Sequence, residues 1–241
     1  MTVDFDALSK SYDLTRNANA NIVKLMLSEL TLDGKNVLDF GCGTGNYAIM
    51  FRESVSANIY GVEPSDGMRE HAITKGVDAR KGNHSDIPFE DDFFDFIYMT
   101  DVIHHVPDTE EMFREFYRVL RPHGLICILT ESYKQLESRF FVKHFPSTVD
   151  VEKTRYPDIC DIIAVAEKAN FYEHKTVVTD ETSEVIVSEG FLKQVENKGY
   201  SMFRIISEVD YKTGLALLKK DFECKTIINT AHGETLLWLK K

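Results

Sequence analysis

The sequence is poor in the residues that mark secreted, fibrous or disordered chains. Its 241 residues include only four Cys, six Pro and thirteen Gly. The cysteines stand far apart, with no C-x-x-C pair and no Cys/His cluster at zinc spacing, which argues against a disulfide framework and a structural zinc site. So little Gly and Pro excludes a collagen-like chain. Sixteen Phe and ten Tyr are too many for a disordered one.

Positive charge and long apolar runs are also scarce. Lys and Arg number 28 against 39 Asp and Glu, which gives a net charge of −11. A field of this sign repels polyanions, so nucleic acid is not expected as a partner. The apolar runs are far shorter than the roughly 18 residues of a membrane span, and the N-terminal stretch lacks the apolar region of a signal peptide. We therefore expect a cytoplasmic protein without a membrane span.

Short apolar segments alternate with segments of helical periodicity over most of the chain. Strands are expected near 36–40, 58–63, 78–81, 95–100, 124–131 and 172–179, with a last pair near 225–230 and 234–239. Helices are expected at 18–30, 46–53, 66–75, 109–120 and 159–170. This alternation predicts a doubly wound α/β fold, in which a mostly parallel sheet is covered by helices on both faces.

Two segments break the alternation. Residues 133–157 and 181–222 fit no strand–helix unit and are rich in Phe, Tyr and charge. We expect a single domain with a cofactor-binding core at 33–132, to which these segments and 1–30 are additions. The ligand crevice of an open α/β sheet lies beyond the carboxyl ends of the strands, so additions placed there would form a cap on the substrate side. The alternative is that they only cover an edge of the sheet.

The most informative stretch is VLDFGCGTGN, which runs from Val37 to Asn46. A buried strand enters a glycine-dense turn, in which glycines allow positive φ and close approach of a ligand, and a helix follows. The dinucleotide fingerprint would need a third glycine where Asn46 stands. A carboxylate at Asp39 would repel a pyrophosphate but suits a cation. S-adenosylmethionine carries an ammonium and a sulfonium and no phosphate, so the turn favours it over NAD.

Further candidate residues follow the next strands. Glu63 ends the second strand, where an acidic side chain can accept hydrogen bonds from both ribose hydroxyls of an adenosine. Met68 lies one turn into the next helix and could cover the adenine, with core packing as the alternative. The third strand is followed by the stretch from Asn83 to Phe89, and the fourth by the stretch from Asp101 to Asp108.

At this point the sequence resembles the class I S-adenosylmethionine-dependent methyltransferases, in particular the small-molecule branch of the ubiquinone/menaquinone-biosynthesis type (methyltransferase type 11). VLDFGCGTG matches the first motif of that family in full. Residues 62–65 resemble its ribose-binding motif, and 83–89 resemble its adenine-binding stretch. Residues 5–13 resemble its N-terminal segment, whose tyrosine, here Tyr12, often closes over the cofactor. The resemblance is close over residues 5–132.

The resemblance implies a Rossmann-like, seven-stranded sheet with helical cap additions and a small-molecule acceptor. It departs at Asn83, where the family commonly has Asp, although the Asn amide oxygen can still accept from the adenine amino group. The candidate cofactor-binding residues are Tyr12, Arg16, Asp39, Phe40, Gly41, Cys42, Gly43, Gly45, Glu63, Pro64, Met68, Asn83, His84, Ser85 and Thr100.

Candidates for catalysis are fewer. Methyl transfer is an in-line displacement, so alignment in a dry site supplies much of the rate, and a base is needed only for a protonated nucleophile. His104 and His105 follow the fourth strand and are the candidate catalytic residues, with a structural role as the alternative. His144, Arg155 and Tyr156 are weaker candidates for acceptor contacts. No metal site is expected.

Three other functions remain open from the sequence. A nucleic-acid (tRNA) methyltransferase is disfavoured by the acidic charge and by the residues 100–103, which lack the Asp/Asn-Pro-Pro-aromatic motif of enzymes that methylate exocyclic amino groups of bases. A non-methylating enzyme that uses S-adenosylmethionine and a non-catalytic binder are the other two. The sequence does not reveal the acceptor, the atom that is methylated, or whether the chain is a monomer or a homodimer.

Overall fold

The computed structural model describes residue 6, residues 17–179 and residues 181–241. These residues fold into two compact units. The described parts of Asp4–Thr130, Cys160–Val177 and Leu236–Lys241 form the first, which we call the core unit. Glu131–Ile159 and Val178–Thr235 belong to the other, which we call the second unit. Within the described residues, no helix has both the length and the apolar character that a membrane crossing requires.

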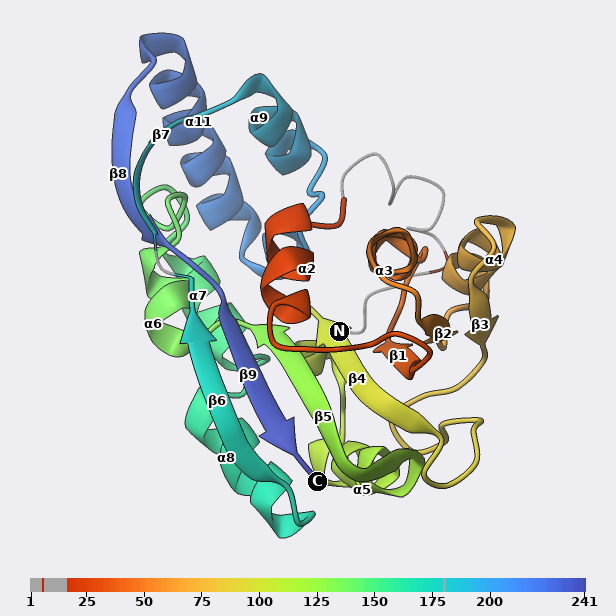
Figure 1. Ribbon diagram of the computed structural model, residues 1–241. Coiled ribbons are helices and arrows are strands. Elements are labelled where there is room, and N and C mark those ends of the chain that lie inside the picture. The colour runs from red at the N-terminus through yellow and green to blue at the C-terminus, as the bar shows by residue number, and fades with distance from the viewer. Residues whose placement is uncertain (1–5, 7–16, 180) are drawn as a thin grey trace. The chain divides into compact units, whose positions relative to one another are not determined.

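The core unit is built on a seven-stranded sheet in the order β3-β2-β1-β4-β5-β9-β6 (Figure 1). Neighbouring strands are parallel from β3 to β5, and the arrow of β9 runs opposite to those of β5 and β6 in Figure 1. The predicted mostly parallel, Rossmann-like sheet is therefore confirmed. Its strands are β1 (Asn36–Phe40), β2 (Asn58–Val62), β3 (Asp78–Arg80), β4 (Phe94–Thr100), β5 (Leu120–Thr130), β6 (Tyr172–Val178) and β9 (Thr235–Lys240).

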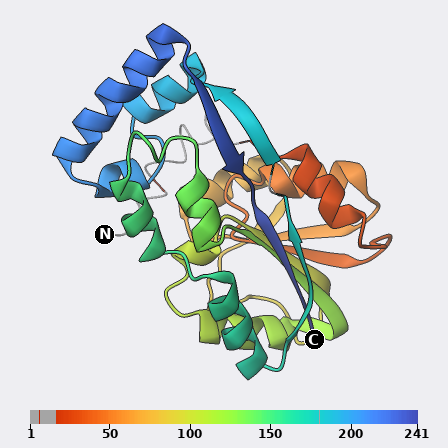
Figure 2. The same cartoon turned by 90° about the vertical axis from the view of Figure 1, so that its left-hand side faces the viewer.

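Helices cover both faces of this sheet, as Figures 1 and 2 show. One face carries α2 (Ala20–Leu27), α3 (Asn46–Ser54) and α4 (Asp66–Thr74), and the other carries α5 (Thr109–Val119) and α8 (Ile159–Lys168). Buried side chains of the strands therefore pack against helices on one face of the sheet or the other. Tyr98 of β4 stacks on Phe51 of α3 with ring centroids 4.3 Å apart. Phe40 of β1 meets Phe116 of α5 edge to face at 4.9 Å on the other side.

Some expected boundaries are wrong. The first helix was expected at 18–30 but α2 covers only Ala20–Leu27, because Asn19 caps its first turn and the chain leaves the helix at Ser28. Within α2, Val23 is buried, whereas Leu25 is 39% exposed. β5 begins at Leu120, before the expected position 124, because Leu120 already pairs with Phe94 of β4 ahead of a register shift.

The two segments outside the strand–helix order belong to the second unit. They contain α6 (Tyr133–Ser138), α7 (Ser147–Lys153), β7 (Glu181–Ile186), α9 (Glu189–Glu196), α10 (Met202–Ile205) and α11 (Glu208–Cys224). The expected strand near 225–230 is β8 (Ile227–His232), and it pairs antiparallel with β7 instead of joining the large sheet. Phe145, Phe203 and Tyr211 lie in a hydrophobic core of this unit's own residues.

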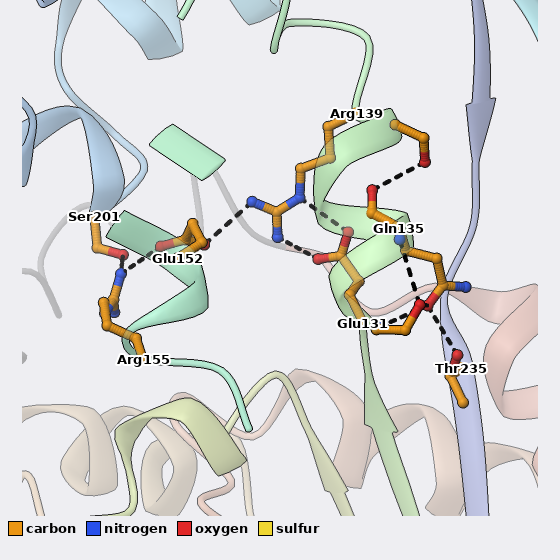
Figure 3. A network of polar contacts seen from close by, with 9 residues as sticks. Glu131, Gln135, Arg139, Glu152, Arg155, Ser201 and Thr235 are labelled. Carbon is orange, nitrogen blue, oxygen red and sulfur yellow. Dashed lines mark hydrogen bonds and ion pairs between the residues drawn. The ribbon is translucent and has the colours of Figure 1, made fainter. Parts of the chain in front are cut away.

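A buried polar network also holds the second unit together (Figure 3). Arg139, whose side chain is 10% exposed, forms ion pairs with Glu131 and, at 3.1 Å, with Glu152. Arg155 donates to the other Glu152 oxygen at 2.7 Å and to Ser201 Oγ at 2.9 Å. The network joins residues that lie far apart in sequence. Arg155, a weaker candidate for an acceptor contact, is held by partners of its own unit.

Candidate cofactor site

The glycine turn after β1 has a conformation that other residues would not readily adopt. Gly41 has φ +73°, and a Cβ added there would lie 2.7 Å from a methyl group of Val102. Gly45, the N-cap of α3, has φ +81°, and a Cβ there would meet Val77 at 3.0 Å. These close approaches and the left-handed φ values explain the glycines physically. The turn is further tied to β2, since the Gly41 and Cys42 N–H groups donate to Val62 O.

Asp39 lies beneath this turn and is 1% exposed. Burial raises the pKa of its carboxyl to about 7, while the nearby Tyr98 hydroxyl and the Ala48 N–H in the first turn of α3 favour the charged form. Neither Asp39 Oδ2 nor the Tyr98 hydroxyl has a partner at good hydrogen-bond geometry in the described part of the chain. Asp39 is thus a desolvated carboxyl that a nearby cation would stabilise in its charged form.

Glu63 follows β2 directly and is 6% exposed. Its Oε2 accepts from the Gly43 N–H at 3.0 Å, and its Oε1 accepts from the Ser65 N–H at 2.9 Å. Burial raises the pKa of Glu63, and these two N–H groups and Arg69 partly offset that rise. A carboxylate oxygen has two lone pairs, so each one can still accept from a ligand hydroxyl. The carboxylate therefore bridges the glycine turn and the turn after β2.

The turn after β3 is closed by its own side chains. Asn83 is exposed, and its Oδ1 accepts from the Ser85 N–H at 2.8 Å and from Ser85 Oγ at 2.9 Å. A backbone bridge between Asn83 and Asp86 completes the turn. The amide oxygen that the sequence assigned to adenine is thus already held by the loop. His84 Nε2 lies 3.7 Å from Glu111 Oε2.

The segment after β4 holds the two candidate catalytic histidines. Asp101 takes a left-handed φ of +57°. A short 3-10 helix, η1 (Ile103–His105), follows it. The rings of His104 and His105 lie 4.0 Å apart, with His104 half-buried and His105 exposed. β4 lies next to β1, and Tyr98 is paired with Asp39. The histidines therefore follow the strand that adjoins the glycine turn.

The remaining candidates differ in what the structure says of them. Tyr12 and Arg16 lie outside the described residues. Met68 is 1% exposed, so its packing in α4 already accounts for its apolar side chain. Thr100 is half-buried at the end of β4. Sequence reasoning missed Tyr98, whose position beside Asp39 depends on the pairing of β1 with β4.

The arrangement fits an adenosine-bearing cation. The glycines of the turn let a ligand approach the backbone closely, and the two buried carboxyls of Asp39 and Glu63 border the turn. Two desolvated carboxyls would disfavour a pyrophosphate, whereas they favour ribose hydroxyls and a positive charge. The fold is that of a class of Rossmann-like enzymes that use S-adenosylmethionine, and the chemistry of these residues suits that cofactor.

Comparison with known proteins identifies the family. Residues 38–128 match the family described as a methyltransferase domain. A demethylmenaquinone methyltransferase of Listeria welshimeri is 31% identical over 158 residues, which cover 57% of this chain and 67% of the relative. Phosphoethanolamine N-methyltransferase 2 of Caenorhabditis elegans is 28% identical over 182 residues, which cover 70% of this chain and 40% of the relative. A methyltransferase structure from Anabaena variabilis matches with a TM-score of 0.71 and 22% identity, covering 93% of this chain and 98% of that one.

The chain belongs to the class I S-adenosylmethionine-dependent methyltransferases, in the branch that acts on small molecules. The resemblance stated from the sequence is thereby confirmed, and with it the cofactor and the enzyme class.

Proposed function

We propose that the core unit binds S-adenosylmethionine at the carboxyl ends of β1, β2 and β4 and that the enzyme methylates a small, mostly apolar acceptor. The observation that carries this proposal is the Glu63 carboxylate, which is buried and held by the backbone N–H groups of Gly43 in the glycine turn and of Ser65 in the turn after β2. Such a fixed acceptor suits two adjacent hydroxyls of a ribose.

The remaining residues have distinct roles in this proposal. When bound, S-adenosylmethionine supplies an electrophilic methyl group on a sulfonium. Asp39 lies under the turn, where its charged form would be stabilised by the cationic end of the cofactor. The backbone from Phe40 to Gly45 would line the ligand, and Asn83 to Ser85 would border the adenine. From the sequence alone, Tyr12 stays in the proposal as a residue that closes over the cofactor. Arg16 stays in it as a residue that would meet the carboxylate of the methionine part of the cofactor.

The acceptor is a proposal of its own. The relatives are named for demethylmenaquinone and for N-methylation of phosphoethanolamine, so their names give two different acceptors. Aromatic side chains are abundant in the second unit, including Phe140, Phe141 and Phe191. The aromatic-rich composition of residues 133–157 and 181–222 supports an acceptor that is mostly apolar.

Calorimetry with S-adenosylhomocysteine tests the cofactor site. Glu63→Ala removes hydrogen bonds to a charged group, which contribute about 1.5–3 kcal/mol each, so the affinity should fall at least about tenfold. Glu53→Ala is the matched control, because Glu53 is an exposed glutamate at the C-terminal end of α3. An unchanged affinity in Glu63→Ala places the ribose elsewhere. NAD should give no shift in melting temperature, and equal stabilisation by NAD would contradict the proposal.

Whether a general base is used can be tested at His104 and His105. Each is replaced by Ala, and turnover is compared with binding of S-adenosylhomocysteine. A base acts only on the rate, so its loss should lower kcat by about a hundredfold or more while affinity is kept. If both variants turn over as fast as the original protein, these histidines have a structural role.

We propose, in addition, that the protein is cytoplasmic and works as a monomer or homodimer without a nucleic-acid partner. The net charge of −11 supports the last point, since it opposes approach to a polyanion. Binding of tRNA at about 150 mM salt would contradict it.

A further inference from the structure

Asp6 is held at the first turn of α4, far from its own place in the sequence. Its Oδ1 accepts from Ser65 Oγ at 2.6 Å and from the Gly67 N–H at 2.8 Å. Ser65 is the N-cap of α4, and its Oγ also accepts from the Met68 N–H. A carboxylate is favoured here because the first N–H groups of a helix lack intrahelical partners and carry a partial positive charge. These bonds lower the pKa of Asp6, which is therefore charged at neutral pH.

The same turn carries Glu63. The Ser65 N–H donates to Glu63 Oε1, and the Gly43 N–H donates to Glu63 Oε2. An unbroken chain of hydrogen bonds therefore leads from Asp6 through Ser65 to Glu63 and the glycine turn. All four residues belong to the core unit.

We propose that Asp6 is a positioning residue for the cofactor, because it fixes Ser65 and thereby the Glu63 carboxylate that receives the ribose. This inference rests on the role proposed for Glu63. Asp6 itself touches no ligand in this scheme. Without its carboxylate, the Ser65 hydroxyl and the Gly67 N–H lose their acceptor, and the turn after β2 has to be ordered when the ligand binds. Ordering on binding lowers affinity, whereas a preorganised turn does not incur that cost.

The charge of Asp6 gives this role a second signature. Burial raises the pKa of Glu63 most, and the negative charge of Asp6 adds to it, while Arg69 of α4 opposes it. Asp39 of β1 and Cys42 of the turn also interact electrostatically with Glu63. If Asp6 loses its charge but keeps its oxygen, Glu63 should protonate at lower pH than in the original protein. The acid limb of ligand binding should then move to lower pH.

Two substitutions separate geometry from charge in the full chain. S-adenosylhomocysteine is titrated calorimetrically at about pH 7.5 and then across the acid range. Asp6→Ala removes the acceptor of the Ser65 hydroxyl and the Gly67 N–H and should weaken binding about three- to tenfold, the size of about one lost hydrogen bond. Asp6→Asn keeps an acceptor oxygen, so it should stay within about twofold of the original affinity at the higher pH and move the acid limb downward. Asp33→Ala and Asp33→Asn are the charge-matched controls at an exposed position.

The outcomes discriminate. If Asp6→Ala binds as well as Asp33→Ala, Asp6 only caps α4 and the inference is wrong. It is also wrong if Asp6→Asn binds as weakly as Asp6→Ala and leaves the acid limb in place. Glu63→Ala is measured in parallel. If that variant keeps full affinity, the proposed cofactor site fails and the inference with it. If Glu63→Ala binds weakly while Asp6→Ala does not, only the inference fails.

Discussion

Asp39→Asn should stabilise the folded chain, and the gain should grow with pH. Asp39 is fully buried and its pKa is raised from 3.8 to about 7 by that burial. The folded state therefore holds this proton more tightly than the unfolded state, so stability falls as pH rises between these two values. An amide stays neutral throughout and escapes this loss. Its new N–H group would also face the Tyr98 hydroxyl, which lacks a well-formed hydrogen bond.

The size of the effect follows from the two pKa values. At about pH 5 the raised pKa of Asp39 lowers the folding equilibrium constant of the original protein by about 1.2 powers of ten. At about pH 8 the loss reaches the full separation of the two pKa values, about 3.2 powers of ten. The difference of about two powers of ten, at about 1.36 kcal/mol each, is about 2.7 kcal/mol. Asp39→Asn should thus gain about 2.7 kcal/mol on the original protein between these pH values, as an upper figure, because local water entry would reduce it.

Urea unfolding at both pH values measures this gain. Asp33→Asn removes the same charge at an exposed position and should show almost no pH-dependent difference. A stability gap between Asp39→Asn and the original protein that stays constant from acid to alkaline pH would refute the reasoning. It would mean that Asp39 is ionised in the folded chain at both pH values, and that burial does not govern its titration.

Three further predictions use matched pairs. Gly41→Ala should cost more stability than Gly34→Ala in thermal melts. Both positions have positive φ, which costs about 1–2 kcal/mol, but only at Gly41 does the new Cβ meet Val102. Equal losses in the two variants would contradict the packing argument. Arg139→Ala removes the ion-pair partner of the buried Glu131 and one of the two arginines that pair with the buried Glu152, and it should cost about 3–5 kcal/mol in urea unfolding. Arg114→Ala at a 68% exposed site should change stability by less than about 0.5 kcal/mol. Asp39→Asn should weaken binding of the cationic S-adenosylmethionine in calorimetry about tenfold, and unchanged affinity would remove Asp39 from the site.

The core unit could be predicted from the sequence because its signals are local. The expected strand at 36–40 coincides with β1, and the expected helix at 46–53 differs from α3 by one residue. The glycine turn between them lies within ten residues, so its strand, turn and helix are read from one stretch. The parallel order follows once short buried strands alternate with helices, since such strands need crossover helices.

The second unit could not be predicted in this way, because its order depends on contacts between distant residues. β7 has the sequence ETSEVI, in which four of the six residues are polar, and it becomes a strand by pairing with β8 about forty residues later. The ring contact between Phe145 and Phe203, with centroids 4.8 Å apart, likewise joins the segment before α7 to α10, more than fifty residues later. Neither pairing has a periodicity that a short window can detect, so the sequence indicated only aromatic-rich segments outside the regular order.

Asp6 was missed for a related reason. An isolated aspartate in a polar stretch has no pattern of its own, and its partner Ser65 is 59 residues away. The signal that could have found it lies at Ser65, which precedes a helix as a typical N-cap and leaves the Gly67 N–H in need of an acceptor. The first N–H groups of α4 need acceptors, so the sequence could have predicted a second carboxylate or hydroxyl at this helix end. It could not have predicted which residue supplies that group.

The residues that define the cofactor site are also those that break local rules of stability. Gly41 holds a left-handed turn against Val102, and Asp39 and Glu63 are carboxyls taken out of water. Buried carboxyls and left-handed turns reduce the stability of a folded chain, and they persist where a ligand recovers the loss. A cation near Asp39 would lower its pKa again, so binding of S-adenosylmethionine should release part of a proton near pH 7. Proton release, measured as a dependence of the binding enthalpy on the buffer, should disappear in Asp39→Asn. If it persists there, the proton comes from another group and the cation does not face Asp39.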